Sequence, residues 1–161
     1  MKTTKQVISD SRIPSSLVNA VVRQLGGKES LTDIYNYGID GGFHGFIYYS
    51  ETIAFFKRNR KAITQLVEDM ANDLGKNPVD MVAGFNCLDG RDMQQLQAGN
   101  AVWITADQRR RARDRDHILS EHRPSITRCL YGGRLTDDDT QVANALAWFA
   151  GEEVARAFCD E

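Results

Sequence analysis

The sequence predicts a mainly α-helical fold, namely a compact single domain of about six to eight helices with room for one short strand pair. Its 161 residues are close to the commonest size of one domain and can bury a full core. Apolar residues recur at helical spacing in several segments, and glycine, proline or a capping residue bounds most of them. No repeat or low-complexity linker divides the chain, so residues 1–161 form one predicted domain. Within it, residues 1–12 are expected to be mobile.

The first predicted helix follows Pro14 and ends at the glycine pair 26–27, which is typical of a helix C-terminus. Its apolar residues lie at helical spacing: Leu17, Val18, Val21, Val22 and Leu25. Ser30 can cap a second, shorter helix that stops at Gly38.

The strongest amphipathic pattern lies in a longer predicted helix that begins at Ser50 or Thr52. Apolar residues there occupy positions i, i+3, i+4, i+7 and i+11: Ile63, Leu66, Val67, Met70 and Leu74. A basic run, KRNRK at 57–61, precedes the pattern, and Asn59 within it could divide the region into two helices. Gly75 is expected to end the helix.

Capping signals predict the remaining helices. Asn77 followed by proline is an N-cap signal for a short helix through Val82. Residues 125–130 predict another short helix, and the acidic turn 136–139 predicts the start of a long last helix, because carboxylates suit the positive end of a helix dipole. The stretch 101–105 has strand-like character, although it could equally open a helix.

Composition argues against several classes of protein. No run of about eighteen apolar residues exists, so no membrane span is expected, and no apolar segment near Met1 resembles a secretory signal. The protein is therefore expected in the cytoplasm, namely the cytosol of a bacterial host. A net charge of −2 argues against a general nucleic-acid binder. The cysteines are odd in number and far apart, which predicts buried free thiols: Cys87, Cys129 and Cys159.

The first candidate site is a glycine-rich turn surrounded by aromatic residues. Eight of the fourteen aromatic residues lie between Tyr35 and Phe56. The glycines match neither a phosphate-binding loop nor a dinucleotide-binding motif. Asp40 and His44 could form an acid–base pair beside Tyr48, but no serine or cysteine at a recognisable nucleophile position accompanies them. The alternative is an ordered turn in which Asp40 accepts backbone N–H groups.

The second candidate site is an arginine-rich segment with five arginines in seven residues: Arg109, Arg110, Arg111, Arg113 and Arg115. Guanidinium groups bind phosphates and acidic protein surfaces in a forked geometry. Asp114 and Asp116 could pair with these arginines along a helix, so a solvated, self-paired helix is the alternative.

No cofactor or metal site is expected. His117, His122 and Cys129 do not have a familiar ligand spacing, because the five-residue gap places the histidines on different helix faces. The acidic triplet 137–139 is better explained by helix capping than by magnesium binding.

Two stretches carry a resemblance to a known family. One reads GIDGGFHGF at 38–46, and the other reads DTQVANALAWFA at 139–150. Over residues 30–158 the chain resembles an uncharacterised family of small proteins carried by bacteriophages and other mobile elements, which offers no catalytic residues to carry over. By analogy, small mobile-element proteins without enzyme motifs are often anti-CRISPR or anti-restriction inhibitors that occupy a nucleic-acid path or a subunit interface.

The expected function is therefore that of a non-catalytic inhibitor that binds a host protein or nucleoprotein complex. Two alternatives stay open at this point. One is a small enzyme with a pocket around Asp40 and His44, and the other is a nucleic-acid-binding accessory protein that uses residues 109–115. The sequence does not predict an oligomeric state.

Overall fold

The computed structural model describes residues 1–25, 31–32, 35, 49–83 and 122–159. All the regular structure in these ranges is helical, which confirms the mainly α-helical class. The stretch 101–105, where a strand was one of two alternatives, lies outside them.

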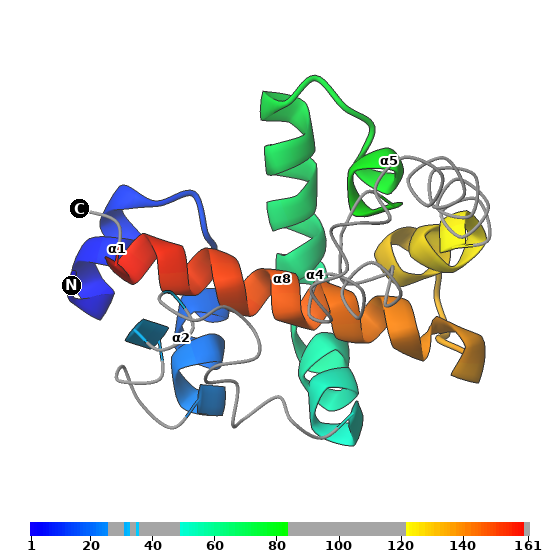
Figure 1. Cartoon of the computed structure of the whole chain (residues 1–161), viewed down its shortest axis with the longest axis horizontal. Coiled ribbons are helices and arrows are strands. Elements are labelled where there is room, and N and C mark those ends of the chain that lie inside the picture. The colour runs from blue at the N-terminus through cyan, green and yellow to red at the C-terminus, as the bar shows by residue number, and fades with distance from the viewer. Residues whose placement is uncertain (26–30, 33–34, 36–48, 84–121, 160–161) are drawn as a thin grey trace, which may run out of the picture.

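The described elements are all helical, and Figure 1 shows their arrangement. Their bounds are α1 Thr4–Asp10, α2 Ser15–Leu25, α4 Tyr49–Asp73, α5 Pro78–Ala83, the 3-10 turn η5 Asp137–Asp139, and α8 Thr140–Cys159. A further helix covers residues 122–131 and is called helix 122–131 below.

Helix α1 was not among the helices that the sequence predicted. A reciprocal cap starts it: the Gln6 backbone N–H donates to the Thr3 hydroxyl at 3.2 Å, and the Thr3 backbone N–H donates to the Gln6 side chain at 2.8 Å. Val7 is its buried residue, and the Lys2 backbone N–H donates to the Phe158 carbonyl at 2.8 Å. Because the helix buries so little, its sequence shows no amphipathic period.

Helix α4 bends where the sequence predicted a division. Asn59 has φ −114° and ψ 15°, outside the helical range, and its side-chain amide donates to the Phe55 carbonyl at 2.9 Å. The chain leaves the helix at Gly75, whose φ of 65° is a left-handed conformation that other residues adopt at a cost. Both predictions, at Asn59 and at Gly75, are confirmed.

Two of the predicted helix starts are also confirmed, whereas the helix predicted over 125–130 already includes residue 122. Asn77 caps α5, since its side-chain oxygen accepts the Val79 backbone N–H at 2.9 Å. At the start of α8, the Thr136 backbone N–H donates to the Asp139 carboxylate at 3.0 Å. The acidic turn therefore caps a helix as predicted, through its last aspartate.

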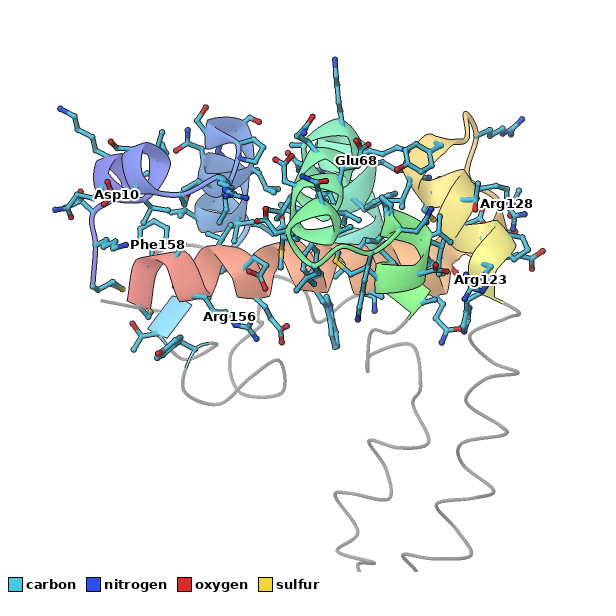
Figure 2. All side chains as sticks on the ribbon, turned by 90° about the horizontal axis from the view of Figure 1, so that it is seen from above. Asp10, Glu68, Arg123, Arg128, Arg156 and Phe158 are labelled. Atoms are coloured by element: carbon cyan, nitrogen blue, oxygen red, sulfur yellow. The ribbon has the colours of Figure 1, made fainter. Side chains whose placement is uncertain are left out.

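Helix α8 is the axis of the described fold, and α4 crosses it at a steep angle and makes extensive contact with it (Figure 1). In the perpendicular view, α1, α2, α4 and helix 122–131 follow one another along one side of α8, and Phe158 lies between α8 and α1 (Figure 2). Thr52 joins the start of α4 to α8 by donating to the Asn144 side-chain oxygen at 2.6 Å.

The core runs the length of α8, whose buried residues are mostly alanine, valine, leucine and phenylalanine. The largest side chains that are fully buried come from several helices: Phe55, Phe56, Phe158, Leu17, Ile63, Ile126 and Leu146. The sequence predicts Phe43, Phe46 and Phe55 as residues that hold the fold. Phe55 does so, at 1% exposure, whereas the other two lie outside the described residues. Among the described helices, none is both long and apolar enough to cross a bilayer.

Candidate functional site

The residues predicted from sequence to bind a partner all lie outside the described residues: Asp40, His44, Tyr48, Arg109, Arg110, Arg111, Arg113 and Arg115. Their roles therefore stay predictions. His117 also lies outside, whereas His122 and Cys129 are described. Within the described ranges, no group of three histidine, cysteine or acidic side chains is placed to hold a metal ion.

The described residues build a different candidate site, on the middle turns of α4. Lys57, Arg58 and Lys61 are exposed there, and together we call them the α4 cationic surface. In the described part of the chain, none of the three has a carboxylate within ion-pair distance. Arg58 donates a long hydrogen bond of 3.4 Å to Gln24. The sequence shows the basic run at 57–61 but does not by itself predict a site there.

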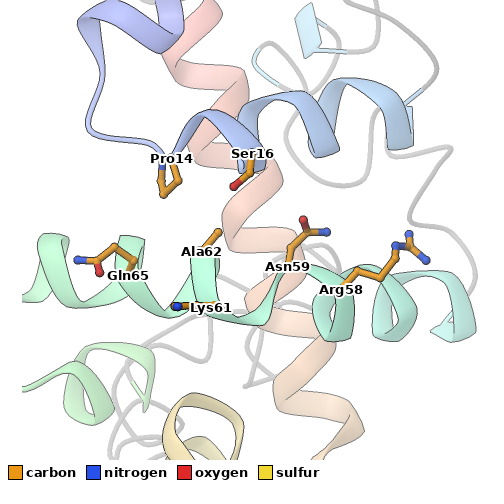
Figure 3. A pocket seen from close by; sticks show the side chains of 7 residues that line it. All are labelled: Pro14, Ser16, Arg58, Asn59, Lys61, Ala62 and Gln65. Carbon is orange, nitrogen blue, oxygen red and sulfur yellow. The ribbon is translucent and has the colours of Figure 1, made fainter.

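Two open hollows flank this surface and share Arg58, Lys61 and Gln65. The first, of about 380 Å³, lies between α4 and the start of α2 (Figure 3). Its lining residues are Pro14, Ser16, Arg58, Asn59, Lys61, Ala62 and Gln65. The second, of about 550 Å³, lies between α4 and the end of helix 122–131. Its lining residues are Lys57, Arg58, Arg60, Lys61, Thr64, Gln65, Glu68, Leu130, Tyr131 and Gly132.

Arg60, which also lines the second hollow, caps the end of helix 122–131. Its Nε donates to the Cys129 carbonyl at 2.7 Å, and its Nη1 donates to the Gly133 carbonyl at 2.7 Å. Its Nη2 donates to the carbonyls of Arg128 and Gly132. These carbonyls belong to the last turn of the helix and the residues that follow it, where the helix itself supplies no partner. One guanidinium group therefore fixes the second hollow's two walls to each other.

A buried carboxylate holds the other side of helix 122–131. Asp139 is fully buried and accepts hydrogen bonds from the Ser125 hydroxyl at 2.8 Å and from Arg128 Nη2 at 2.7 Å. Burial alone would raise the pKa of the Asp139 carboxyl. The hydrogen bonds from Arg128, from the Thr136 backbone and from Ser125 outweigh burial, so its pKa lies well below the usual value. This network ties helix 122–131 to the start of α8.

Cys129 lies between these two anchors as a buried free thiol, as the sequence predicted. Its Sγ donates to the Asp139 carbonyl at 3.7 Å. Burial, followed by the nearby Asp139 charge, raises the pKa of the thiol to about 12. A thiol that stays protonated is a poor nucleophile and a poor metal ligand. Cys159 is free and half-buried, and Cys87 lies outside the described residues.

Tyr131 and Glu68 complete the second hollow. Tyr131 is 54% exposed, although it directly follows the buried Leu130. Partial burial, followed by the nearby charge of the Glu68 carboxylate, raises the pKa of its hydroxyl. Glu68 projects outward from α4 (Figure 2). The hollow therefore has cations and an exposed aromatic ring with one carboxylate beside it, a set of groups suited to binding charged ligands.

The model of one protein family, described as a domain of unknown function (DUF7222), matches residues 16–161 of the chain. The matched region contains α4, helix 122–131 and α8, and therefore all the groups of the second hollow. No curated protein and no solved structure matches the chain. The family description gives no activity.

Proposed function

Because the chain belongs to the DUF7222 family, whose function is unknown, we propose from its surface that it is a non-catalytic binding protein. In this proposal the α4 cationic surface binds a negatively charged face of a protein or nucleoprotein complex. The bound complex is a host defence complex of the CRISPR or restriction type, which the protein inhibits by covering that face.

The observation that carries the proposal is the absence of carboxylate partners around Lys57, Arg58 and Lys61 within the described residues. Cations that are already paired have less attraction to offer a partner, because the pairing offsets their charge. Other arginines of the protein are paired in this way: Arg12 with Asp73, Arg123 with Asp80, and Arg156 with Glu153. The net charge of the whole chain is −2, so the cluster on α4 is a local concentration of positive charge.

The surface is also well supported from beneath. Phe55, Phe56 and Ile63 bury the opposite face of α4 in the core, and α4 makes its main contact with α8. Arg60 fixes the neighbouring helix end. A preorganised surface loses less conformational entropy on binding, which favours a role in recognition.

The part of the proposal that concerns host defence comes from the resemblance of residues 38–46 and 139–150 to mobile-element proteins. Inhibitors of this kind need no catalytic residues, since covering a nucleic-acid path or a subunit interface is sufficient. Arginine is among the residues that dominate the binding energy of interfaces, and a one-turn cluster of cations gives a partner a defined point of attachment.

The proposal is tested by expressing the protein in bacterial strains that carry an active CRISPR or restriction system. We expect plaque formation by a targeted phage, or transformation by a targeted plasmid, to rise by orders of magnitude over an empty-vector control. A tagged copy should recover subunits of the inhibited complex from the same cells. Unchanged immunity in the strains, together with recovery of no stable partner, would contradict the proposal.

A further inference from the structure

The second hollow brings together the two groups that recognise a single strand of nucleic acid, namely cations for the phosphates and an exposed aromatic ring for a base. We infer that it binds single-stranded DNA or RNA, with phosphates on Lys57, Arg58 and Lys61 and one base stacked on Tyr131. This inference rests on the proposed function, since it names the component of a nucleoprotein partner that the surface contacts.

The form of the hollow favours a polymer over a small molecule. It is open, with a volume of about 550 Å³, and most of its described lining residues are charged or polar. Sites for small molecules are usually enclosed and mostly apolar, whereas Leu130 is the one aliphatic side chain among the described residues here. An open, charged hollow between two helices can accommodate a strand that lies across it.

The cations are arranged along one wall of the hollow. Lys57 and Lys61 are four residues apart and lie on either side of the bend at Asn59. Such a row can contact successive phosphates of a backbone that follows the helix. Arg60 is not counted among the phosphate contacts, because its N–H groups donate to the carbonyls at the end of helix 122–131.

The other wall suits a base. Tyr131 is 54% exposed, and it lines the hollow together with Glu68. An exposed aromatic ring offers a face on which a base can stack. The Glu68 carboxylate can accept a hydrogen bond from the amino group of a base, as carboxylates do from cytosine N4.

Glu68 also discriminates between the two kinds of polyanion that the cations could attract. An acidic polypeptide would bring carboxylates toward Glu68 and be repelled there. A nucleic-acid strand separates its charge from its bases, so its phosphates can lie along α4 while a neutral base lies near Glu68 and Tyr131. The hollow therefore fits a nucleic-acid strand better than an acidic peptide.

The test is fluorescence anisotropy of a labelled short oligothymidine, titrated with the purified full chain. Affinity should fall with salt, with a slope of log K against log salt of about −2 if three cations each contact one phosphate. Lys61→Gln should make that slope shallower by about 0.7.

Tyr131→Ala should weaken binding about 5- to 100-fold, while Tyr131→Phe, which keeps the ring, should stay within about twofold of the parent. Lys5 and Lys76 are exposed elsewhere on the protein, so Lys5→Gln/Lys76→Gln is the charge-matched control.

Several results would overturn the inference. These are no binding of oligothymidine, parental affinity in Tyr131→Ala, loss of binding only on substitution of Arg110 and Arg111, or equally effective competition by polyglutamate. If the protein still protects phage in cells, any of these results would show that the surface does not contact a nucleic-acid strand. The proposed inhibitory function would not be contradicted by that result. Loss of the cellular effect in the parent protein would count separately against that function.

Discussion

The Nε atom of Arg60 on α4 donates a hydrogen bond of 2.7 Å to the backbone carbonyl oxygen of Cys129, which lies 69 residues further along the chain. The same guanidinium group donates to the carbonyls of Arg128, Gly132 and Gly133. Arg60 thereby supplies, from another helix, the cap that the last turn of helix 122–131 lacks. It also sets the position of Tyr131 relative to the α4 cationic surface.

Removing this cap should destabilise the protein. We expect Arg60→Ala to lower the free energy of unfolding by roughly 2–3 kcal/mol, because several charge-assisted hydrogen bonds are lost together. Arg60→Lys should restore only part of the loss, since an ammonium group cannot fork between carbonyls on two sides. The matched control is Arg58→Ala on the exposed face of α4. Urea denaturation measures all three, and equal stability of the two alanine variants would contradict the assignment.

Two adjacent glycines at the end of helix 122–131 offer a paired test of packing. A Cβ atom at Gly132 would lie 2.8 Å from both the Cα and the carbonyl oxygen of Arg128, whereas one at Gly133 would have no described neighbour within 4 Å. Gly132→Ala should therefore cost about 1–3 kcal/mol, because backbone atoms have to shift. Gly133→Ala should change the free energy of unfolding by less than about 0.5 kcal/mol. A thermal melt compares the two variants, and a larger loss at Gly133 would be inconsistent with this geometry.

The buried Asp139 predicts a specific dependence of stability on pH. Its pKa in the folded protein lies below the unfolded value of about 3.9, so its stabilising contribution is present above that pH and is lost as the pH falls toward the folded value. We expect Asp139→Asn to lower the free energy of unfolding at neutral pH by about 2–3 kcal/mol. This figure is below that for a fully buried pair, because the Arg128 side chain is 41% exposed.

The variant should also lose part of the acid dependence of stability below pH of about 4. Asp137→Asn removes the same charge from an exposed neighbour and serves as the control. Denaturation curves collected at several pH values separate the two variants. Parallel pH profiles for Asp139→Asn and the parent would show that Asp139 is not ion-paired in the folded state.

Cys129 should be protected from thiol reagents in the folded protein. Its pKa of about 12 leaves very little thiolate at pH near 8, so alkylation should be about a thousandfold slower than for an ordinary cysteine. Cys159, which is half-buried, provides an internal comparison. Peptide mapping by mass spectrometry after timed labelling distinguishes the two sites. Labelling of native Cys129 at the rate found in denaturant would contradict the described burial.

The features that the sequence predicted correctly are those that local chemistry determines. Asn77 caps α5, Gly75 ends α4 and Asn59 bends it, and each of these depends on residues within about one helical turn. The mainly α-helical class depends on the same local signals. Helix α1 was missed because Val7 alone is buried in it, so there was no apolar period to detect.

The long-range contacts could not be predicted in this way. Arg60 and the carbonyls that it caps are about 70 residues apart in sequence, and Asp139 is buried only because Ser125 and Arg128 fold over it. The candidate site also depends on a long-range contact and could not be predicted from the sequence. The basic run at 57–61 forms a wall of a hollow only because helix 122–131 packs beside it. The sites predicted at Asp40, His44 and residues 109–115 lie outside the described residues and stay predictions.

The most direct test of the α4 cationic surface as the functional surface is a charge reversal in the cellular protection assay. Lys57→Glu/Lys61→Glu is compared with Lys5→Glu/Lys76→Glu, which makes the same change of charge at exposed lysines elsewhere. Both variants should keep the parent's melting temperature, because all four side chains are exposed. We expect the α4 variant to lose protection of a targeted phage and the control to retain it. Equal protection by the two variants would contradict a role for this surface.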